Sequence, residues 1–435
     1  MDSVTVGILG FLIFFTLMAL GVPIAFSMGM VGFFGIWYLG DLTAALSTVG
    51  MLPFSWGADY TFMCIPLFVL MGHFANRAGV ITKFFDAAYK WAGSLPGGLA
   101  IATTLASGAF GAVSGSSSAS AATMSTICIP EMKKYNYNRR LMTGSVAMGG
   151  TLAILIPPSL GFVIYGIITE ESIGKLFVAG ILPGIMMVFL NSLVIYFMCK
   201  TNPTLGPPGP PSTLGEKIIS LKGSWEILVI FFAVIGGMYS GVFTPTEGAA
   251  VGCFITFAFS LAKRKLARKE FMGDLATTAK VTLMIFMLII GAMVFNQFMA
   301  LTGISEKLRN YVVTLTVNPY LALTFILFTY FIAGCIMDSV AMAFLLLPIY
   351  YPIIIALGFN GIWFGVIGTV MAEIGLLTPP IGLNCFVVHG VFPEYPLEEI
   401  FRGIWPFVAM DIVIVIILIL FPQISLFLPS FMGKR

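Results

Sequence analysis

The stretch "GSSSASAATMSTICIP", from Gly115 to Pro130, contains five serines and two threonines, although the sequence on either side of it is strongly apolar. So dense a polar run should either stay outside a membrane or interrupt a membrane span. Irregular backbone at membrane depth is tolerated only where protein or a water-filled cavity satisfies its polar groups. We therefore predict that this stretch forms the tip of a hairpin that ends part-way across the bilayer.

The composition of the chain is that of an integral membrane protein. Of its 435 residues, 59% are hydrophobic and 9% are charged, whereas soluble domains carry about 25% charged residues. Apolar runs of roughly 20 residues recur without alternation, which favours helical spans over a β-barrel. Scattered single cysteines, two histidines and the absence of a GxxxxGK[ST] motif argue against a transition-metal site and a nucleotide-binding loop.

The second half of the sequence resembles a shifted copy of the first. A shift of 222 positions places Ser117 on Ser339, and it places the proline pair of "LAILIPPSLG" on that of "EIGLLTPPIG". The order of the matching segments is kept throughout. We therefore predict an all-α polytopic membrane protein with two structural repeats, residues 1–200 and 224–435, joined by a Pro/Gly-rich linker, residues 201–223.

The distribution of Lys and Arg indicates how each repeat crosses the membrane, because cytoplasmic loops collect these residues. Five crossings are predicted in the first repeat, near residues 3–20, 23–40, 60–76, 140–168 and 174–200. An odd number inverts the second repeat, and the basic loop 133–140 indeed has an uncharged counterpart, "IALGFNGIWFG". The linker is then cytoplasmic and both termini are periplasmic, in a bacterial inner membrane. The basic segment 263–280 is predicted to form an amphipathic helix along the cytoplasmic surface.

Each repeat is predicted to contain two interruptions at matching positions. Re-entrant hairpins are expected at about 98–130 and 319–356, and helices broken by a proline pair at about 140–168 and 361–390. Proline removes a helix donor, so nearby carbonyls lose their partners. Matching broken helices in inverted repeats indicate a transporter binding site near the bilayer midplane. Freed carbonyls and hydroxyls suit Na⁺, and helix N-termini at the tips suit an anion, although small-residue runs also serve close helix packing.

Four motifs, "GTLAILIPPS", "FTPTEGAAV", "MDSVAMAFLLLPI" and "IGLLTPPIGLN", resemble the large membrane subunit of tripartite ATP-independent periplasmic (TRAP) transporters. The resemblance covers nearly the whole chain. It implies a Na⁺-driven importer of organic acid anions such as sialic acid or C4-dicarboxylates, with an elevator architecture of scaffold and moving transport domain. It also implies two partners, a small four-helix membrane subunit and a periplasmic substrate-binding protein. No nucleic-acid partner is expected.

The resemblance and the two interruptions together give the candidate site residues, with two or more Na⁺ ions expected. The first predicted Na⁺ site comprises Ser114, Gly115, Ser116, Ser117, Gly149, Gly150, Thr151 and Pro157. The second comprises Gly334, Met337, Asp338, Ser339, Gly375, Thr378 and Pro379. The predicted substrate contacts are Ser116, Ser118, Ser339, Pro158 and Pro380. Because Ile156 stands where the second repeat has Thr378, backbone oxygens would have to replace a hydroxyl in the first site.

Four acidic residues at or near membrane depth keep more than one interpretation. Asp338 is a candidate Na⁺ ligand or a helix cap, and Glu373 would tune a cation site or pair with a lysine. Glu247 favours a structural role at a helix start. Asp411 is expected to face a neighbouring helix, with no identifiable partner.

Three other classes of function compete with a tripartite importer. A stand-alone Na⁺/anion symporter without a binding protein is the nearest alternative. An ion channel does not require paired broken helices with mobile hairpins. An intramembrane enzyme would need a nucleophile–base pair or metal ligands at membrane depth, and no histidine lies near either tip in the sequence. We therefore predict that the chain is not an enzyme.

Overall fold

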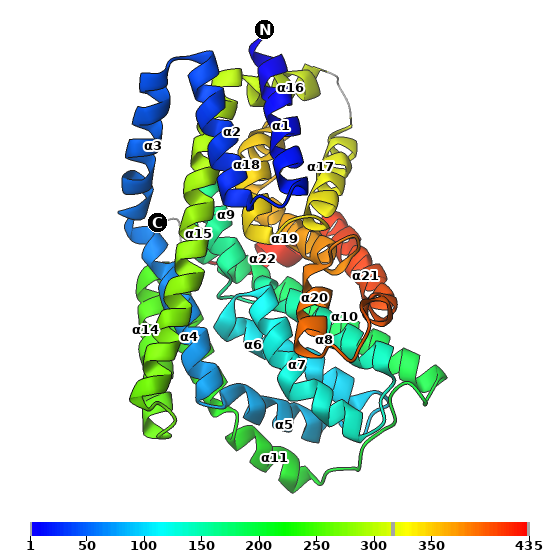
Figure 1. The fold of residues 1–435 in the computed structure, drawn as a ribbon. Coiled ribbons are helices and arrows are strands. Elements are labelled where there is room, and N and C mark those ends of the chain that lie inside the picture. The colour runs from blue at the N-terminus through cyan, green and yellow to red at the C-terminus, as the bar shows by residue number, and fades with distance from the viewer. Residues whose placement is uncertain (1, 315–317, 433–435) are drawn as a thin grey trace.

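The computed structural model describes residues 2–314 and 318–432, and all regular elements within these ranges are helical (Figure 1). The all-α prediction is confirmed for this part of the chain. The predicted positions of the two termini concern residues 1 and 433–435, which lie outside the described residues.

The first half of the chain (residues 2–201) begins with five α-helices, which are followed by a hairpin and a broken span. Its elements are α1 (Ser3–Ala19), α2 (Ile24–Leu39), α3 (Leu42–Gly57), the 3₁₀ turn η1 (Tyr60–Met63), α4 (Cys64–Arg77), α5 (Val80–Ala92), α6 (Gly98–Ser114), α7 (Ser117–Lys134), α8 (Arg139–Leu155), α9 (Leu160–Thr169) and α10 (Ile173–Thr201). Helix α3 was not predicted. It bends by 58° relative to the segment Tyr60–Arg77.

The linker that was predicted at 201–223 contains a helix and is tied to the first half. Its helix is α11 (Leu214–Lys222), which starts with a capping box between Thr213 and Glu216. Before this helix, the backbone N–H of Gly97 donates to the carbonyl of Gly206 over 3.0 Å. The linker therefore lies against the end of the molecule where α5 also lies (Figure 1).

The second half (residues 224–432) repeats the order of hairpin and broken span. Its elements are α12 (Trp225–Phe231), the π turn η2 (Phe232–Gly236), α13 (Gly237–Tyr239), α14 (Pro245–Ala262), α15 (Arg268–Thr302), α16 (Ile304–Thr314), α17 (Pro319–Gly334), α18 (Ser339–Ala356), α19 (Gly361–Leu377), α20 (Leu383–Val391), α21 (Leu397–Leu420) and α22 (Gln423–Ser430). The prediction of a separate surface helix at 263–280 is wrong. The chain turns at 263–267 and then runs without interruption through α15, a helix of 35 residues.

Several helices are long and apolar enough to cross a membrane. Within the described residues five qualify by length and composition, namely α10, α14, α15, α18 and α21, and eight if each of three bent pairs is counted as one span. Five more apolar helices, among them α1 and α2, are 16 or 17 residues long. Large apolar side chains such as Phe54 and Leu20 are 79% and 75% exposed, as expected for a surface that faces lipid rather than water. The prediction of a polytopic membrane protein is therefore confirmed.

The two hairpins lie in opposite parts of the molecule. Figure 1 shows α6 and α7 in the lower half and α17 and α18 in the upper half. The end of each hairpin that joins its two helices points towards the middle, where α9, α19 and α20 lie. The loops between the paired helices thus meet the two broken spans well inside the protein.

Candidate functional site

The tip of hairpin 1 (residues 114–118, hereafter tip 1) is built by a glycine turn and a serine cap. Gly115 has φ of 59° and ends α6, a conformation that glycine adopts without steric cost. Ser116 caps α7, since its side chain accepts from the N–H of Ala119 over 3.4 Å. These two residues reverse the chain within one short loop.

Tip 1 packs against the interruption between α8 and α9 (residues 156–159, break 1). The N–H of Leu160 donates to the carbonyl of Gly115 over 3.3 Å. A Cβ atom added to Gly115 would lie 2.7 Å from the carbonyl oxygen of Pro158, and one added to Gly150 would lie 3.0 Å from that of Ser117. The structure therefore brings together the two segments that were predicted to form the first Na⁺ site.

Two hydroxyl groups of this first predicted site differ in whether they already form a hydrogen bond. The Thr151 hydroxyl donates to the carbonyl of Met148 over 2.7 Å. Ser114 is 6% exposed, and its Oγ has no hydrogen-bond partner among the described residues. An unpartnered hydroxyl in an apolar interior is costly, so Ser114 is available to a ligand. Pro157, in break 1, is buried.

The second half repeats this arrangement with different contacts. The tip of hairpin 2 (residues 335–338, tip 2) lies against the interruption between α19 and α20 (residues 378–382, break 2), where the N–H of Ile381 donates to the carbonyl of Cys335 over 3.2 Å. The Cys335 Sγ and Thr378 Oγ1 atoms are 2.9 Å apart. A Cβ atom on Gly375 would lie 2.6 Å from the Cα of Gly334. The segments predicted for the second Na⁺ site are thus adjacent.

The remaining members of the second set occupy different environments. Met337 is buried, Ser339 is half-buried and Pro379 is exposed. Asp338 is the N-cap of α18 and accepts from the N–H of Val340 over 3.2 Å. The carboxylate therefore has the capping role that was one of its two predicted interpretations.

The predicted substrate contacts do not form one cavity in this structure. Ser116 and Ser118 are half-buried, Pro158 is buried and Pro380 is exposed. Ser339 lines a cavity of about 30 Å³ together with residues of both halves, including Tyr165 and Thr369. That volume admits about one or two waters, whereas ligand pockets usually exceed about 300 Å³. A ligand of ordinary size therefore does not fit this cavity.

One contact connects the two halves at tip 1. The Ser117 hydroxyl donates to Glu373 Oε2 over 2.7 Å, and Asn384 Nδ2 donates to Ser117 Oγ over 2.9 Å. Glu373 is 1% exposed and forms no ion pair within the described residues. The predicted alternative of a lysine partner is therefore wrong, because a serine at the N-terminus of α7 occupies that position. A helix N-terminus favours a neighbouring carboxylate.

Asn384 was missed by the sequence reasoning, although a signal was available. It stands in the apolar run "LNCFVV" just after break 2 and is fully buried. An amide side chain in such a place requires a polar partner. Its partner lies 267 positions away, which a local pattern does not identify.

The other two acids have structural environments. Glu247 and Thr244 form a capping box at the start of α14, with hydrogen bonds of 2.8 and 3.3 Å. This agrees with the structural interpretation of Glu247. Asp411 in α21 faces α10, where it accepts from Asn191 Nδ2 over 2.9 Å. The hydrogen bonds of both acids go to residues outside the two tips.

The fold and the paired interruptions define an integral membrane protein of transporter architecture. Two solved transporters share this fold. The YdaH transporter of Alcanivorax borkumensis has a TM-score of 0.54 at 12% identity, covering 90% of this chain and 89% of its own. The MtrF efflux pump of Neisseria gonorrhoeae has a TM-score of 0.56 at 14% identity, covering 91% and 86%. At these identities the likeness shows the fold alone.

Residues 11–424 match the family described as the tripartite ATP-independent periplasmic transporter, DctM component. The C4-dicarboxylate TRAP transporter large permease DctM of Pseudomonas aeruginosa is 36% identical over 381 residues, or 87% of this chain and 88% of that protein. The sialic acid TRAP transporter large permease SiaM of Vibrio cholerae is 32% identical over 377 residues, 86% and 88%. The chain belongs to the TRAP transporter large permease family, which confirms the resemblance seen in its motifs and supports a transport role rather than an enzymatic one.

Proposed function

We propose that this TRAP large permease couples import of an organic acid anion to Na⁺ and moves its substrate by an elevator mechanism. The observation that carries the proposal is the packing of each hairpin tip on the helix break of its own half. In each half this packing gathers backbone and hydroxyl oxygens in a buried place.

The residues at both sites fit a hard monovalent cation. At tip 1 the donors are hydroxyls and carbonyls, and Ser114 Oγ has no hydrogen-bond partner within residues 2–314 and 318–432. At break 2 the Thr378 hydroxyl donates to the carbonyl of Gly375 over 3.1 Å, and the Cys335 thiol lies 2.9 Å from Thr378 Oγ1, so that one lone pair of Thr378 is left for a cation. Oxygen donors of this kind prefer hard cations to transition metals. When bound, Na⁺ would supply positive charge near the α7 and α18 N-termini and so favour an anionic substrate there.

An organic acid anion is the substrate class that this arrangement supports. Helices α7 and α18 both begin at the tips, and their N-terminal N–H groups favour negative charge. The relatives are named for C4-dicarboxylate and sialic acid, and another, YiaN of Escherichia coli, for 2,3-diketo-L-gulonate. We extend to this chain the shared class, with sialic acid and C4-dicarboxylates as first substrates to test.

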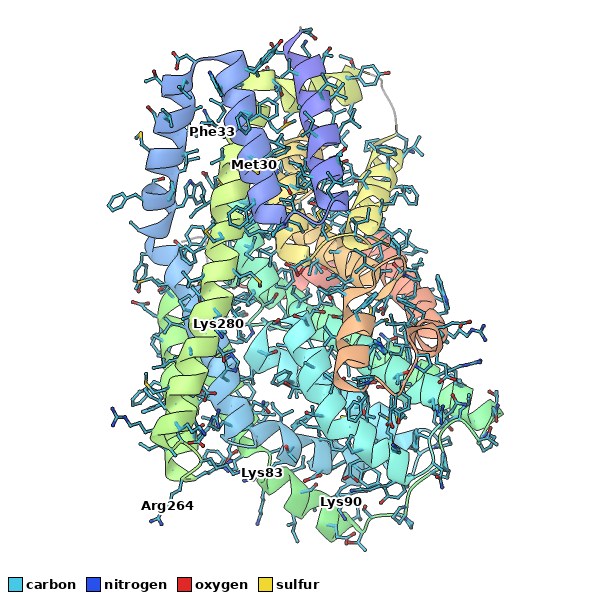
Figure 2. The ribbon with its side chains drawn as sticks, in the orientation of Figure 1. Met30, Phe33, Lys83, Lys90, Arg264 and Lys280 are labelled. Atoms are coloured by element: carbon cyan, nitrogen blue, oxygen red, sulfur yellow. The ribbon has the colours of Figure 1, made fainter. Side chains whose placement is uncertain are left out.

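The elevator proposal assigns the hairpins and broken spans to a moving domain and the long helices to a scaffold. Lys83, Lys90 and Arg264 lie at the lower end of the molecule in Figure 2, which supports a cytoplasmic location for that end and for α11. Hairpin 1 then lies towards the cytoplasm and hairpin 2 towards the periplasm, as two inverted repeats require. The cavity of about 30 Å³ at Ser339 is too small for an organic acid, which supports a mechanism in which the domain must move before substrate enters.

Two partners follow from the family, a small four-helix membrane subunit and a periplasmic substrate-binding protein. We assign the small subunit to the outer face of α3, where Met51 and Phe54 are 70% and 79% exposed and would face either this subunit or lipid. A longer relative, the isethionate TRAP transporter permease DctMQ of Oleidesulfovibrio alaskensis, aligns with this chain over 64% of its own length. The second candidate function is a stand-alone Na⁺/anion symporter.

Uptake into proteoliposomes separates these possibilities. The permease is reconstituted with its small subunit, and ¹⁴C-labelled succinate and N-acetylneuraminate are offered with or without the binding protein and an inward Na⁺ gradient. We expect uptake only when binding protein and gradient are both present. Uptake without the binding protein would favour the stand-alone symporter, and full uptake without Na⁺ would refute Na⁺ coupling.

A further inference from the structure

The distances from Ser117 to the second half indicate which hydrogen bonds its hydroxyl forms. Ser117 Oγ is 2.7 Å from Glu373 Oε2, 2.9 Å from Asn384 Nδ2 and 3.2 Å from Asn384 Oδ1. A hydroxyl has one proton and two lone pairs. The proton goes to the carboxyl oxygen at the shortest distance, and the amide N–H occupies one lone pair. The second lone pair is left for another group.

This remaining lone pair belongs to a residue of the first predicted Na⁺ site. A hydroxyl that donates to an acidic oxygen is polarised, so that its own oxygen becomes a stronger acceptor or ligand. Groups that orient a ligand in this way typically change cation affinity by about 10- to 100-fold. Glu373 and Asn384 therefore both orient the Ser117 hydroxyl and make its oxygen a stronger cation ligand.

The two partners of Ser117 flank break 2. Glu373 lies in α19, two residues before Gly375, and Asn384 is the second residue of α20. Helix α20 packs on both α7 and α8, and Asn384 Nδ2 also lies 3.4 Å from the carbonyl of Ala147 in α8. A change in the backbone at break 2 would therefore move the hydrogen-bond partners of Ser117 at tip 1.

The repeat does not account for this link. The shift of 222 positions places Thr151 on Glu373 and Phe162 on Asn384. Neither residue can reproduce the carboxyl and amide groups at the equivalent place in the first half. Residues of the second half thus contact tip 1, whereas the sequence of the first half has no equivalent acid and amide that could contact tip 2.

We propose that Glu373 and Asn384 are positioning residues that orient the Ser117 hydroxyl, and that they join the cation site of the first half to the helix break of the second. This inference rests on the proposed Na⁺ coupling. Occupation of one site would then influence the other through a single hydrogen-bonded serine.

The test compares Glu373→Leu with Glu373→Gln in the reconstituted transporter. Leucine removes the acceptor, so we expect the Na⁺ concentration for half-maximal uptake to rise about tenfold or more. Glutamine keeps a carbonyl acceptor and should stay within about threefold of the parent protein. The KM for substrate at saturating Na⁺ should change little in either variant. An apolar side chain in a buried membrane position removes a desolvation cost, so the leucine variant should fold.

Asp411→Asn is the matched control, because Asp411 is also a fully buried acid but hydrogen-bonds to Asn191 rather than to Ser117. It should leave the Na⁺ dependence unchanged. A double-mutant cycle with Ser117→Ala completes the test, and Na⁺-dependent thermal stabilisation of the purified protein gives a readout if uptake is lost. In the Ser117→Ala background, Glu373→Leu should have no further effect on Na⁺ affinity.

Three outcomes decide the matter. Full additivity in the cycle, or a shift in Glu373→Leu no larger than in Asp411→Asn, overturns the positioning role while leaving Na⁺ coupling intact. Uptake and thermal stability of the parent protein that are both independent of Na⁺ overturn the coupling itself and, with it, this inference. A shift confined to Glu373→Leu that disappears in the Ser117→Ala background supports it.

Discussion

Arg77, the last residue of α4, forms a bidentate ion pair with Asp274 of α15. Its Nε donates to Oδ2 and its Nη2 donates to Oδ1, each over 2.6 Å. The Asp274 side chain is only 9% exposed. Removing one partner leaves the other charge without compensation, so Arg77→Met should lower the free energy of unfolding by about 1–3 kcal/mol. Thermal unfolding in detergent measures this. Arg309→Gln, which breaks an exposed pair of 3.9 Å with Glu306, should change stability little, and an equal loss in both variants would contradict the prediction.

Glu226 at the start of α12 is shared unequally by two lysines. Its Oε2 lies 2.6 Å from Lys263 Nζ, whereas its Oε1 lies 3.7 Å from Lys83 Nζ. Lys263 also donates to the carbonyl of Ala78 over 2.9 Å. We therefore expect Lys263→Met to lower the melting temperature clearly more than Lys83→Met. If the exposed Lys83 proved equally important, the short contact with Lys263 would not be the one that holds α12, α14 and the end of α4 together.

Lys133 at the end of α7 pairs with Glu394 in the α20–α21 connection over 2.9 Å, beside a cavity of about 310 Å³. The hydrogen bond from Lys133 is the main cause that holds the pKa of Glu394 below its ordinary value of 4.5. A lowered carboxyl pKa stabilises the fold above the unfolded-state value, and this contribution is lost as the pH falls through the folded-state pKa.

The expected result is a pH-dependent difference between the parent protein and Glu394→Gln. The parent should be slightly more stable at pH 7, and the difference should disappear as the pH falls below 4.5. Both side chains are at least half exposed, so the effect should be small and should weaken with salt. Melting temperatures of both proteins from pH 3 to 7 measure it, and a difference that persists at pH 3 would rule out this linkage.

The sequence predicted those parts of the fold that have local signals. The polar run after Gly115 and the two proline pairs place the hairpins within a few residues of α6–α7 and α17–α18, and the breaks between α8 and α9 and between α19 and α20. Helix α3 was missed because Ser, Thr, Gly and Pro53 dilute its apolar pattern. The basic segment 263–280 was misinterpreted because its charges resemble those of a surface helix, whereas residues 268–280 continue without interruption into the apolar part of α15.

The candidate site was less accessible to sequence reasoning, because its contacts depend on the packing of the two halves. Tip 1 and break 1 lie in the same repeat, and the same shift of 222 positions relates each of them to its counterpart in the second half, so the sequence could pair them. The contact of Ser117 with Glu373 joins residues 256 positions apart. Hydropathy marks both as unusual at membrane depth, but only the fold shows that each is the other's partner.

Gly375 in α19, three residues before break 2, packs closely on Gly334 at the end of α17 in hairpin 2. Its added Cβ would lie 2.6 Å from the Cα of Gly334, a backbone atom that cannot turn away. Gly375→Ala should therefore separate tip 2 from the break and reduce Na⁺-dependent uptake by at least about tenfold, because site geometry must hold within about 0.5 Å. Gly390→Ala in α20, where nothing lies within 4 Å of the added Cβ, is the control and should keep full activity. Transport by Gly375→Ala at the parent's rate and Na⁺ affinity would show that close packing of tip 2 on break 2 is not needed to bind the cation.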